Sequence, residues 1–170
     1  MKTDIKKIAL LGAMTAISMI FSYVETMFPI ILPVPGVKIG FANALIVLAL
    51  YMFGPIEALI VGILRIVLTA LLFGSVISFL MSLSGFALSF LIMYLLFRSN
   101  KFSIPGVSLA GGAFHNFGQL ITACILMGST ALIKDTVWFA VFGIITGMAV
   151  GFLSKIVYER VKLNDRIFKG

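Results

Sequence analysis

Apolar residues fill the chain in six long runs, which are separated by short segments rich in glycine, proline and charged residues. A transmembrane helix needs about 20 consecutive apolar residues, so a chain of 170 residues has room for about six spans and for no additional soluble domain. The pattern therefore predicts an all-α integral membrane protein, with residues 1–170 forming one domain of six transmembrane helices. The expected spans cover residues 5–28, 39–53, 56–73, 75–97, 105–127 and 136–158.

The composition supports this membrane assignment. Hydrophobic residues make up 61% of the chain and charged residues 11%, which is more apolar side chain than a soluble domain of this length buries. The first apolar run continues to Phe28 without a small-residue cleavage site, so we expect a first span and not a removable signal peptide. The single cysteine, Cys124, excludes a disulfide within the chain.

The basic residues give the chain a net charge of +7, and their positions favour membrane topology over nucleic-acid binding as the explanation. With the N-terminus in the cytoplasm, ten of the 13 lysines and arginines fall on the cytoplasmic side, whereas Lys38 and Lys134 fall outside and Arg65 lies within a span. This asymmetry follows the positive-inside rule, so we expect a multi-pass protein of the cell membrane with both termini in the cytoplasm. The ten cytoplasmic residues are Lys2, Lys6, Lys7, Arg98, Lys101, Lys155, Arg160, Lys162, Arg166 and Lys169.

The segment that contains the only histidine carries a stripe of small and polar residues. When residues 108–122 are wound as a helix, these residues recur every three or four positions and share one face. Polar groups inside a membrane face the protein interior, where they bind a ligand or a neighbouring helix. We therefore regard His115 and Gln119, with Asn116 at the edge of the stripe, as candidate binding residues; hydrogen bonding to a neighbouring helix is the alternative. The stripe consists of Ser108, Gly111, Gly112, His115, Gln119 and Thr122.

Arg65 lies near the middle of an expected span, where an arginine costs about 2.5–3.5 kcal/mol to insert. It therefore requires a carboxylate, a set of carbonyl groups, a watery cavity or an anionic ligand. Glu57 on the same helix is about 12 Å away along the axis, too far for a direct pair, which leaves Glu25 as the candidate for a structural ion pair. A buried guanidinium also favours a planar anion, so a ligand with a carboxylate or phosphate is the other expectation.

Lys38 and Asn43 follow a proline-rich turn at residues 29–38, close to the expected external ends of the spans. Lys38 is either an interfacial anchor that extends its charge to water or part of the external mouth of a binding pocket. Together with Glu25 and the deeper polar residues, these two residues would line a pocket that opens to the outside.

Two further helix faces consist of small residues, and such faces permit close approach between helices. We expect them to pack against neighbouring helices, and they indicate nothing about a ligand. The two faces are Gly143, Gly147 and Gly151, and Ser75, Ser78, Ser82, Gly85 and Ser89.

Several chemistries are excluded by what the sequence lacks. There is no Walker loop for ATP hydrolysis, and the six acidic residues are isolated, so no aspartate pair is available to hold magnesium and a diphosphate. One histidine and one cysteine do not make a zinc site, and no nucleophile elbow marks a serine. We therefore expect no enzymatic activity, no cofactor and no metal.

Three blocks of the sequence carry a resemblance to a known family. They are PGVKIGFANALIVLALYMFGPIEALIVGILR at residues 35–65, LSGFALSF at residues 83–90 and VSLAGGAFHNFGQL at residues 107–120. These blocks resemble the family known as heptaprenyl diphosphate synthase component I, also called the Gx transporter family, and the resemblance covers most of the chain. The family's first name implies a role in isoprenoid synthesis, but the chain lacks the aspartate-rich motifs of prenyl diphosphate synthases.

The chain also resembles the small six-span substrate-binding (S) components of energy-coupling-factor (ECF) transporters. This resemblance implies capture of a small vitamin-like or isoprenoid- or quinone-related molecule, and partnership with a membrane T component and two ATPases. Arg65 and Lys38 add the expectation that the molecule is anionic. The first helix of such components commonly carries an Ala-x-x-x-Ala face for docking, which Ala9 and Ala13 match. Two alternatives stay open: an accessory membrane subunit of heptaprenyl diphosphate synthesis, and a membrane anchor of a redox complex.

Overall fold

The computed structural model describes residues 2–27, 40–128 and 136–163, and the proline-rich turn lies outside them. Within these residues the chain forms six helices and no strand, which confirms the all-α prediction. Five of the helices are long and apolar enough to cross a membrane, and the chain is a multi-pass membrane protein. The helices are α1 (Lys2–Met27), α2 (Asn43–Met52), α3 (Pro55–Phe73), α4 (Val76–Ser99), α5 (Ile104–Met127) and α6 (Thr136–Leu163).

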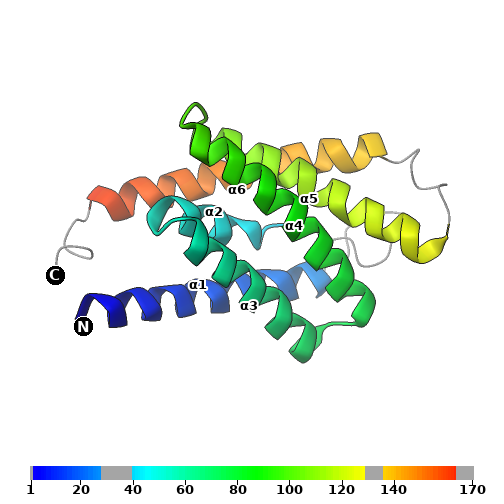
Figure 1. Ribbon diagram of the computed structural model, residues 1–170, viewed down its shortest axis with the longest axis horizontal. Helices are drawn as coiled ribbons and strands as arrows, with labels where there is room; N and C mark the ends of the chain where they lie inside the picture. The colour runs from blue at the N-terminus through cyan, green and yellow to red at the C-terminus, as the bar shows by residue number, and fades with distance from the viewer. Residues whose placement is uncertain (1, 28–39, 129–135, 164–170) are drawn as a thin grey trace.

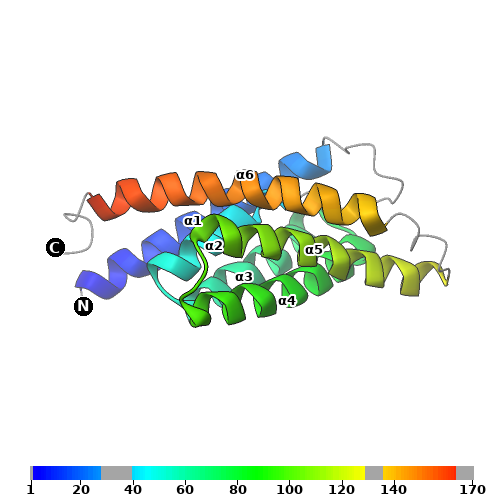
Figure 2. The same cartoon turned by 90° about the horizontal axis from the view of Figure 1, so that it is seen from above.

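The helices run up and down along the long axis of the molecule, so the start of α1 and the end of α6 lie at the same end of the bundle (Figures 1 and 2). The turns between α2 and α3 and between α4 and α5 lie at this end too. Basic residues at these helix ends therefore gather there, and we call it the basic end. Its described basic residues are Lys2, Lys6, Lys7, Arg98, Lys101, Lys155, Arg160 and Lys162.

The second helix is shorter than the expected span at residues 39–53. It has 10 residues and is about 15 Å long, about half of the ~30 Å hydrocarbon core of a bilayer. A turn at Gly40 precedes it, with φ +94°, and the backbone N–H of Asn43 donates to the carbonyl of Gly40 at 2.9 Å. Every residue from Asn43 to Leu50 is buried, so α2 is a half-length helix inside the bundle.

Helices α4, α5 and α6 pack closely through glycines. A Cβ on Gly147 of α6 would lie 2.7 Å from the carbonyl oxygen of Ser108 on α5, and one on Gly143 would lie 2.6 Å from that of Gly112. On the other side of α5, a Cβ on Gly118 would lie 2.9 Å from the Cα of Gly85 on α4. The prediction that these small faces permit close helix approach is confirmed for α6 and for the central part of α4.

The helix ends follow local sequence signals. Ser75 caps α4, because its Oγ accepts a hydrogen bond from the backbone N–H of Ser78 at 3.2 Å, the usual role of a serine at this position. Gly128 ends α5 with φ +59°, a left-handed conformation that glycine adopts without steric cost. The observed ends of α3 to α5 lie within two residues of the expected ends.

Candidate functional site

His115 and Gln119 lie one above the other on α5 and face α4. Their side chains are buried, and Gln119 Nε2 is 3.1 Å from His115 Nε2. The space for them is provided by Gly85, because a Cβ at that position would lie 2.9 Å from His115 Cε1 and 3.0 Å from Gln119 Cγ. The polar stripe predicted from the sequence therefore turns inward, as expected for polar groups within a membrane bundle.

The start of α2 meets this stripe. A Cβ on Gly40 would lie 3.1 Å from Asn43 Nδ2 and 3.7 Å from His115 Cδ2, so the turn before α2 passes directly over the histidine. This brings Asn43 and His115, separated by more than 70 positions in the chain, into one region. We call Asn43, His115 and Gln119 the central polar cluster.

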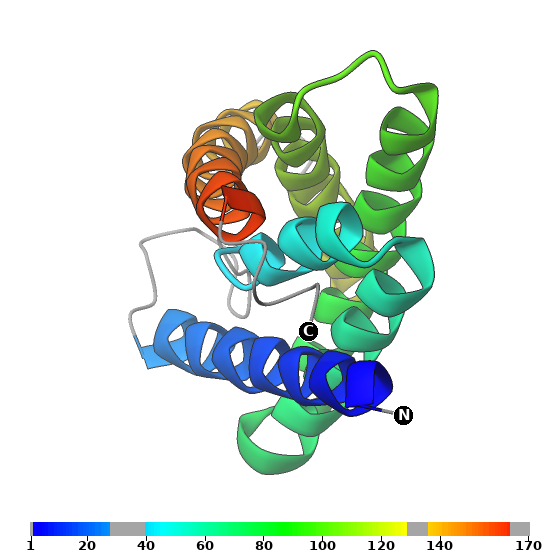
Figure 3. The ribbon, with the colours of Figure 1, turned by 90° about the vertical axis from the view of Figure 1, so that its left-hand side faces the viewer.

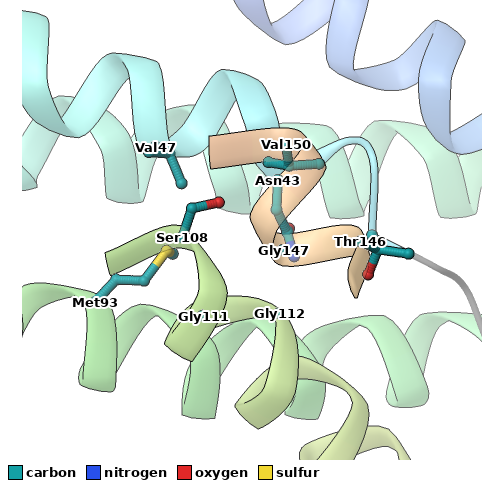
Figure 4. A pocket seen from close by; sticks show the side chains of 10 residues that line it. Asn43, Val47, Met93, Ser108, Gly111, Gly112, Thr146, Gly147 and Val150 are labelled. Carbon is teal, nitrogen blue, oxygen red and sulfur yellow. The ribbon is translucent and has the colours of Figure 1, made fainter. Parts of the chain in front are cut away.

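A small cavity of about 10 Å³ adjoins this cluster and has room for about one water molecule. Figure 4 shows the side chains of Asn43 and Ser108 reaching into the space between α2, α5 and α6. Neither amide atom of Asn43, nor the Ser108 hydroxyl, has a hydrogen-bond partner among the described residues. A buried amide or hydroxyl without a partner costs about 1–3 kcal/mol, so these groups present unused hydrogen-bonding capacity inside the bundle.

Arg65 belongs to a second cluster, between α1 and α3. It is 3% exposed, its Nη1 donates to Ser22 Oγ at 3.0 Å, and it interacts electrostatically with the Glu25 carboxylate. Glu25 Oε1 also accepts a hydrogen bond from the backbone N–H of Phe41. We call Ser22, Glu25 and Arg65 the charged cluster. Arg65 Nε and Nη2 have no hydrogen-bond partner among the described residues, so both the ion pair with Glu25 and an anionic ligand stay predictions for Arg65.

Glu57 does not pair with Arg65, which lies too far along α3 for direct contact; it pairs with a lysine of α1. Its Oε1 is 2.5 Å from the ammonium group of Lys7, and this pair joins the start of α3 to the start of α1 at the basic end.

Asn116 faces away from the central polar cluster. Its Nδ2 donates to the carbonyl of Phe139 at 2.9 Å, which ties α5 to α6 in the bundle interior. Asn116 therefore makes a hydrogen bond to a neighbouring helix, which was the alternative to ligand binding for the polar residues of α5.

The remaining candidates fall outside these clusters. Lys38 lies outside the described residues, so its place at the pocket mouth stays a prediction. Ala9 and Ala13 are exposed on α1. Sequence reasoning missed Ser22 as a partner of Arg65; the signal available was its position three residues before Glu25, on the same face of a helix.

No group of three or more histidine, cysteine, aspartate or glutamate side chains that would hold a metal ion occurs in the described part of the chain. The buried polar side chains of the described residues are amides, hydroxyls, one imidazole and the guanidinium of Arg65. Such groups can bind and orient a molecule through hydrogen bonds.

Residues 14–157 match the family described as heptaprenyl diphosphate synthase component I. The chain belongs to this family. Component I is the non-catalytic component of the synthase, which confirms at the level of the family that the chain is not itself the enzyme. None of the curated proteins and none of the solved structures compared with the chain matches it.

Proposed function

We propose that the chain is the membrane substrate-binding component of an ECF-type importer, and that the central polar cluster binds its ligand. The observation that carries this proposal is the half-length helix α2, which begins inside the bundle beside His115. Short or interrupted spans that place polar groups near the bilayer midplane are typical of membrane transport proteins. The unused hydrogen-bonding groups of Asn43 and Ser108 supply the contacts.

Ligand capture requires a conformational change. The cavity of about 10 Å³ is far smaller than the roughly 300–1,000 Å³ of small-molecule pockets. A ligand must therefore separate α2 from α5 and α6, and it thereby selects the more open state, as expected for alternating access. The ligand we propose is small and vitamin-like or isoprenoid-related.

The basic end supports an orientation with both termini in the cytoplasm of a cell membrane, because cytoplasmic segments carry the excess of lysine and arginine. One-sided labelling of a cysteine introduced at Ser99 tests this orientation, and labelling from the outside only would reverse it.

The exposed small residues of α1 support docking to a membrane T component. Ala9, Gly12, Ala13 and Ala16 are all exposed, and a Cβ on Gly12 would meet no atom within 4 Å. Small residues let a partner helix approach closely.

We expect the chain to copurify with a T component and two ATPases when it is isolated from its native membrane. Ala9→Trp should reduce copurification at least tenfold, since a bulky side chain separates the helices. Ala87→Trp is the control, because Ala87 is exposed on α4, away from this face. Wild-type protein that carries no ATPase, or equal copurification by the two variants, would contradict the proposal.

Asn43→Leu should weaken ligand binding more than tenfold and leave the melting temperature nearly unchanged, because the Asn43 amide makes no hydrogen bond that folding depends on. Native mass spectrometry identifies the retained molecule, and titration then gives its affinity. Asn116→Leu is the matched control: it should lower the melting temperature through loss of the bond to Phe139, while the folded fraction binds normally. Equal affinities in wild type and Asn43→Leu would remove the central polar cluster as the site.

A second candidate function is that of an accessory membrane component in heptaprenyl diphosphate synthesis. The family match supports it. A soluble prenyl synthase in place of the ATPases in the same purification would favour this role.

A further inference from the structure

An apolar groove lies between α1, α2 and α6, on the opposite side of α2 from the central part of α5. Figure 3, which looks from the basic end, shows α1 on one side, α6 on the other and α2 between them. The groove has a volume of about 340 Å³, within the range of sites that hold small molecules. Its lining residues are Leu10, Ala13, Met14, Ile17, Phe21, Ala44, Leu45, Leu48, Leu153, Ser154 and Val157.

The lining offers hydrocarbon contact only. Ser154 is the one polar side chain in it, and its hydroxyl donates to the carbonyl of Ala44 at 3.1 Å, so its hydrogen-bonding need is met within the protein. Ile17 on one rim is 44% exposed and Leu153 on the other is 51% exposed. The groove therefore opens sideways, between α1 and α6, into the hydrocarbon region of the membrane.

The length of the groove indicates what occupies it. Along α1, its longest wall, the lining runs from Leu10 to Phe21, about 16 Å at the rise of an α-helix. This is about half of the ~30 Å hydrocarbon core, the depth of one leaflet. A partner helix that crosses the membrane would need a groove of twice this length, whereas a lipid chain from one leaflet ends where the groove ends.

At the basic end of the groove, each of its two outer walls, α1 and α6, carries a basic residue. Lys6 precedes Leu10 by one turn on the same face of α1, and Arg160 follows Val157 by one turn on α6. Both side chains are exposed. A lipid chain in the groove therefore places its headgroup between two basic side chains, which favours an anionic headgroup.

We propose that this groove is a binding site for an anionic phospholipid of the leaflet at the basic end, with one acyl chain between α1 and α6 and the phosphate between Lys6 and Arg160. The site is separate from the central polar cluster. It shares Ala13 with the proposed docking face of α1, and it does not depend on the transport proposal.

Native mass spectrometry tests this site on the full chain released from vesicles of equal parts phosphatidylglycerol and phosphatidylcholine. We expect one retained phospholipid, with phosphatidylglycerol favoured about tenfold, in line with the attraction of two basic residues to an anionic surface. Ala13→Trp fills the groove and should reduce lipid retention at least tenfold, while Ala87→Trp on α4 retains the lipid.

The double variant Lys6→Gln/Arg160→Gln keeps the apolar groove and removes the two charges. It should still retain a lipid, with the two headgroups now bound about equally; this variant also tests the site if Ala13→Trp does not fold. Wild-type protein without retained lipid, as expected if a helix of a partner or of a second copy covers the groove, would overturn the proposal. Unchanged headgroup preference in the double variant, or full retention in folded Ala13→Trp, would overturn it too.

Discussion

Glu25→Gln should destabilise the folded chain by up to about 3 kcal/mol, the low end of the cost of removing one partner of a buried ion pair, because the Glu25 side chain is only half-buried. Arg65 is 3% exposed and interacts electrostatically with Glu25, so the substitution leaves a guanidinium without a countercharge inside the membrane. Glutamine keeps a carbonyl oxygen that accepts from the N–H of Phe41, which makes charge the main property that changes. Unfolding of the purified chain by a denaturing detergent measures the loss.

A double-mutant cycle separates this role of Arg65 from ligand binding. If the two charges stabilise each other, Arg65→Gln combined with Glu25→Gln should be more stable than the sum of the single losses predicts. Ligand affinity of the folded fraction should then stay unchanged in all three variants. A Glu25→Gln variant of normal stability, together with an Arg65→Gln variant that folds and loses affinity more than tenfold, would instead assign Arg65 to the ligand.

Hydropathy was sufficient to predict the number of helices and most of their ends, because a membrane span is defined by length and apolar content. It did not predict that α2 begins only at Asn43. Residues 39–53 are apolar throughout most of their length, and nothing in their hydropathy distinguishes a helix from the turn at Gly40. The signal was the glycine itself, which adopts φ +94° there.

The candidate site was predicted in part. The three- and four-residue spacing correctly placed His115 and Gln119 on one inward face, since that spacing is a property of the helix alone. Asn116 follows His115 by one residue, which is about 100° around the helix, and it therefore points to α6. Which neighbour lies in that direction depends on the packing of the bundle, and the sequence of α5 carries no information on it.

The charged residues show the same limit. A buried arginine needs compensation, so a partner for Arg65 was predictable, and Glu25 was one of the two structural candidates. The choice between Glu25 and a ligand depends on how α1 packs against α3. Glu25 acts electrostatically on the guanidinium, while Arg65 Nε and Nη2 have no hydrogen-bond partner among the described residues, so the choice between Glu25 and an anionic ligand is left to the stability and affinity of the variants.

The close contact between α5 and α6 leads to the second large effect. Gly112→Leu should destabilise the chain by more than the roughly 1–3 kcal/mol typical of an overpacked core. A Cβ on Gly112 would lie 2.3 Å from the carbonyl oxygen of Gly143 and 2.9 Å from the Cα of Gly147. These are backbone atoms, so no side-chain rotation relieves the overlap and the two helices must separate.

Gly12→Leu provides the matched control, because a Cβ on Gly12 would meet no atom within 4 Å and the residue is exposed. Leucine has a higher helix propensity than glycine, so this variant should be neutral or more stable by up to about 1 kcal/mol. Detergent unfolding of both variants measures the two changes under the same conditions. The predicted difference is one of sign, since the same substitution removes a helix contact at Gly112 and adds helix propensity at Gly12. A Gly112→Leu variant as stable as Gly12→Leu would show that α5 and α6 do not depend on this contact.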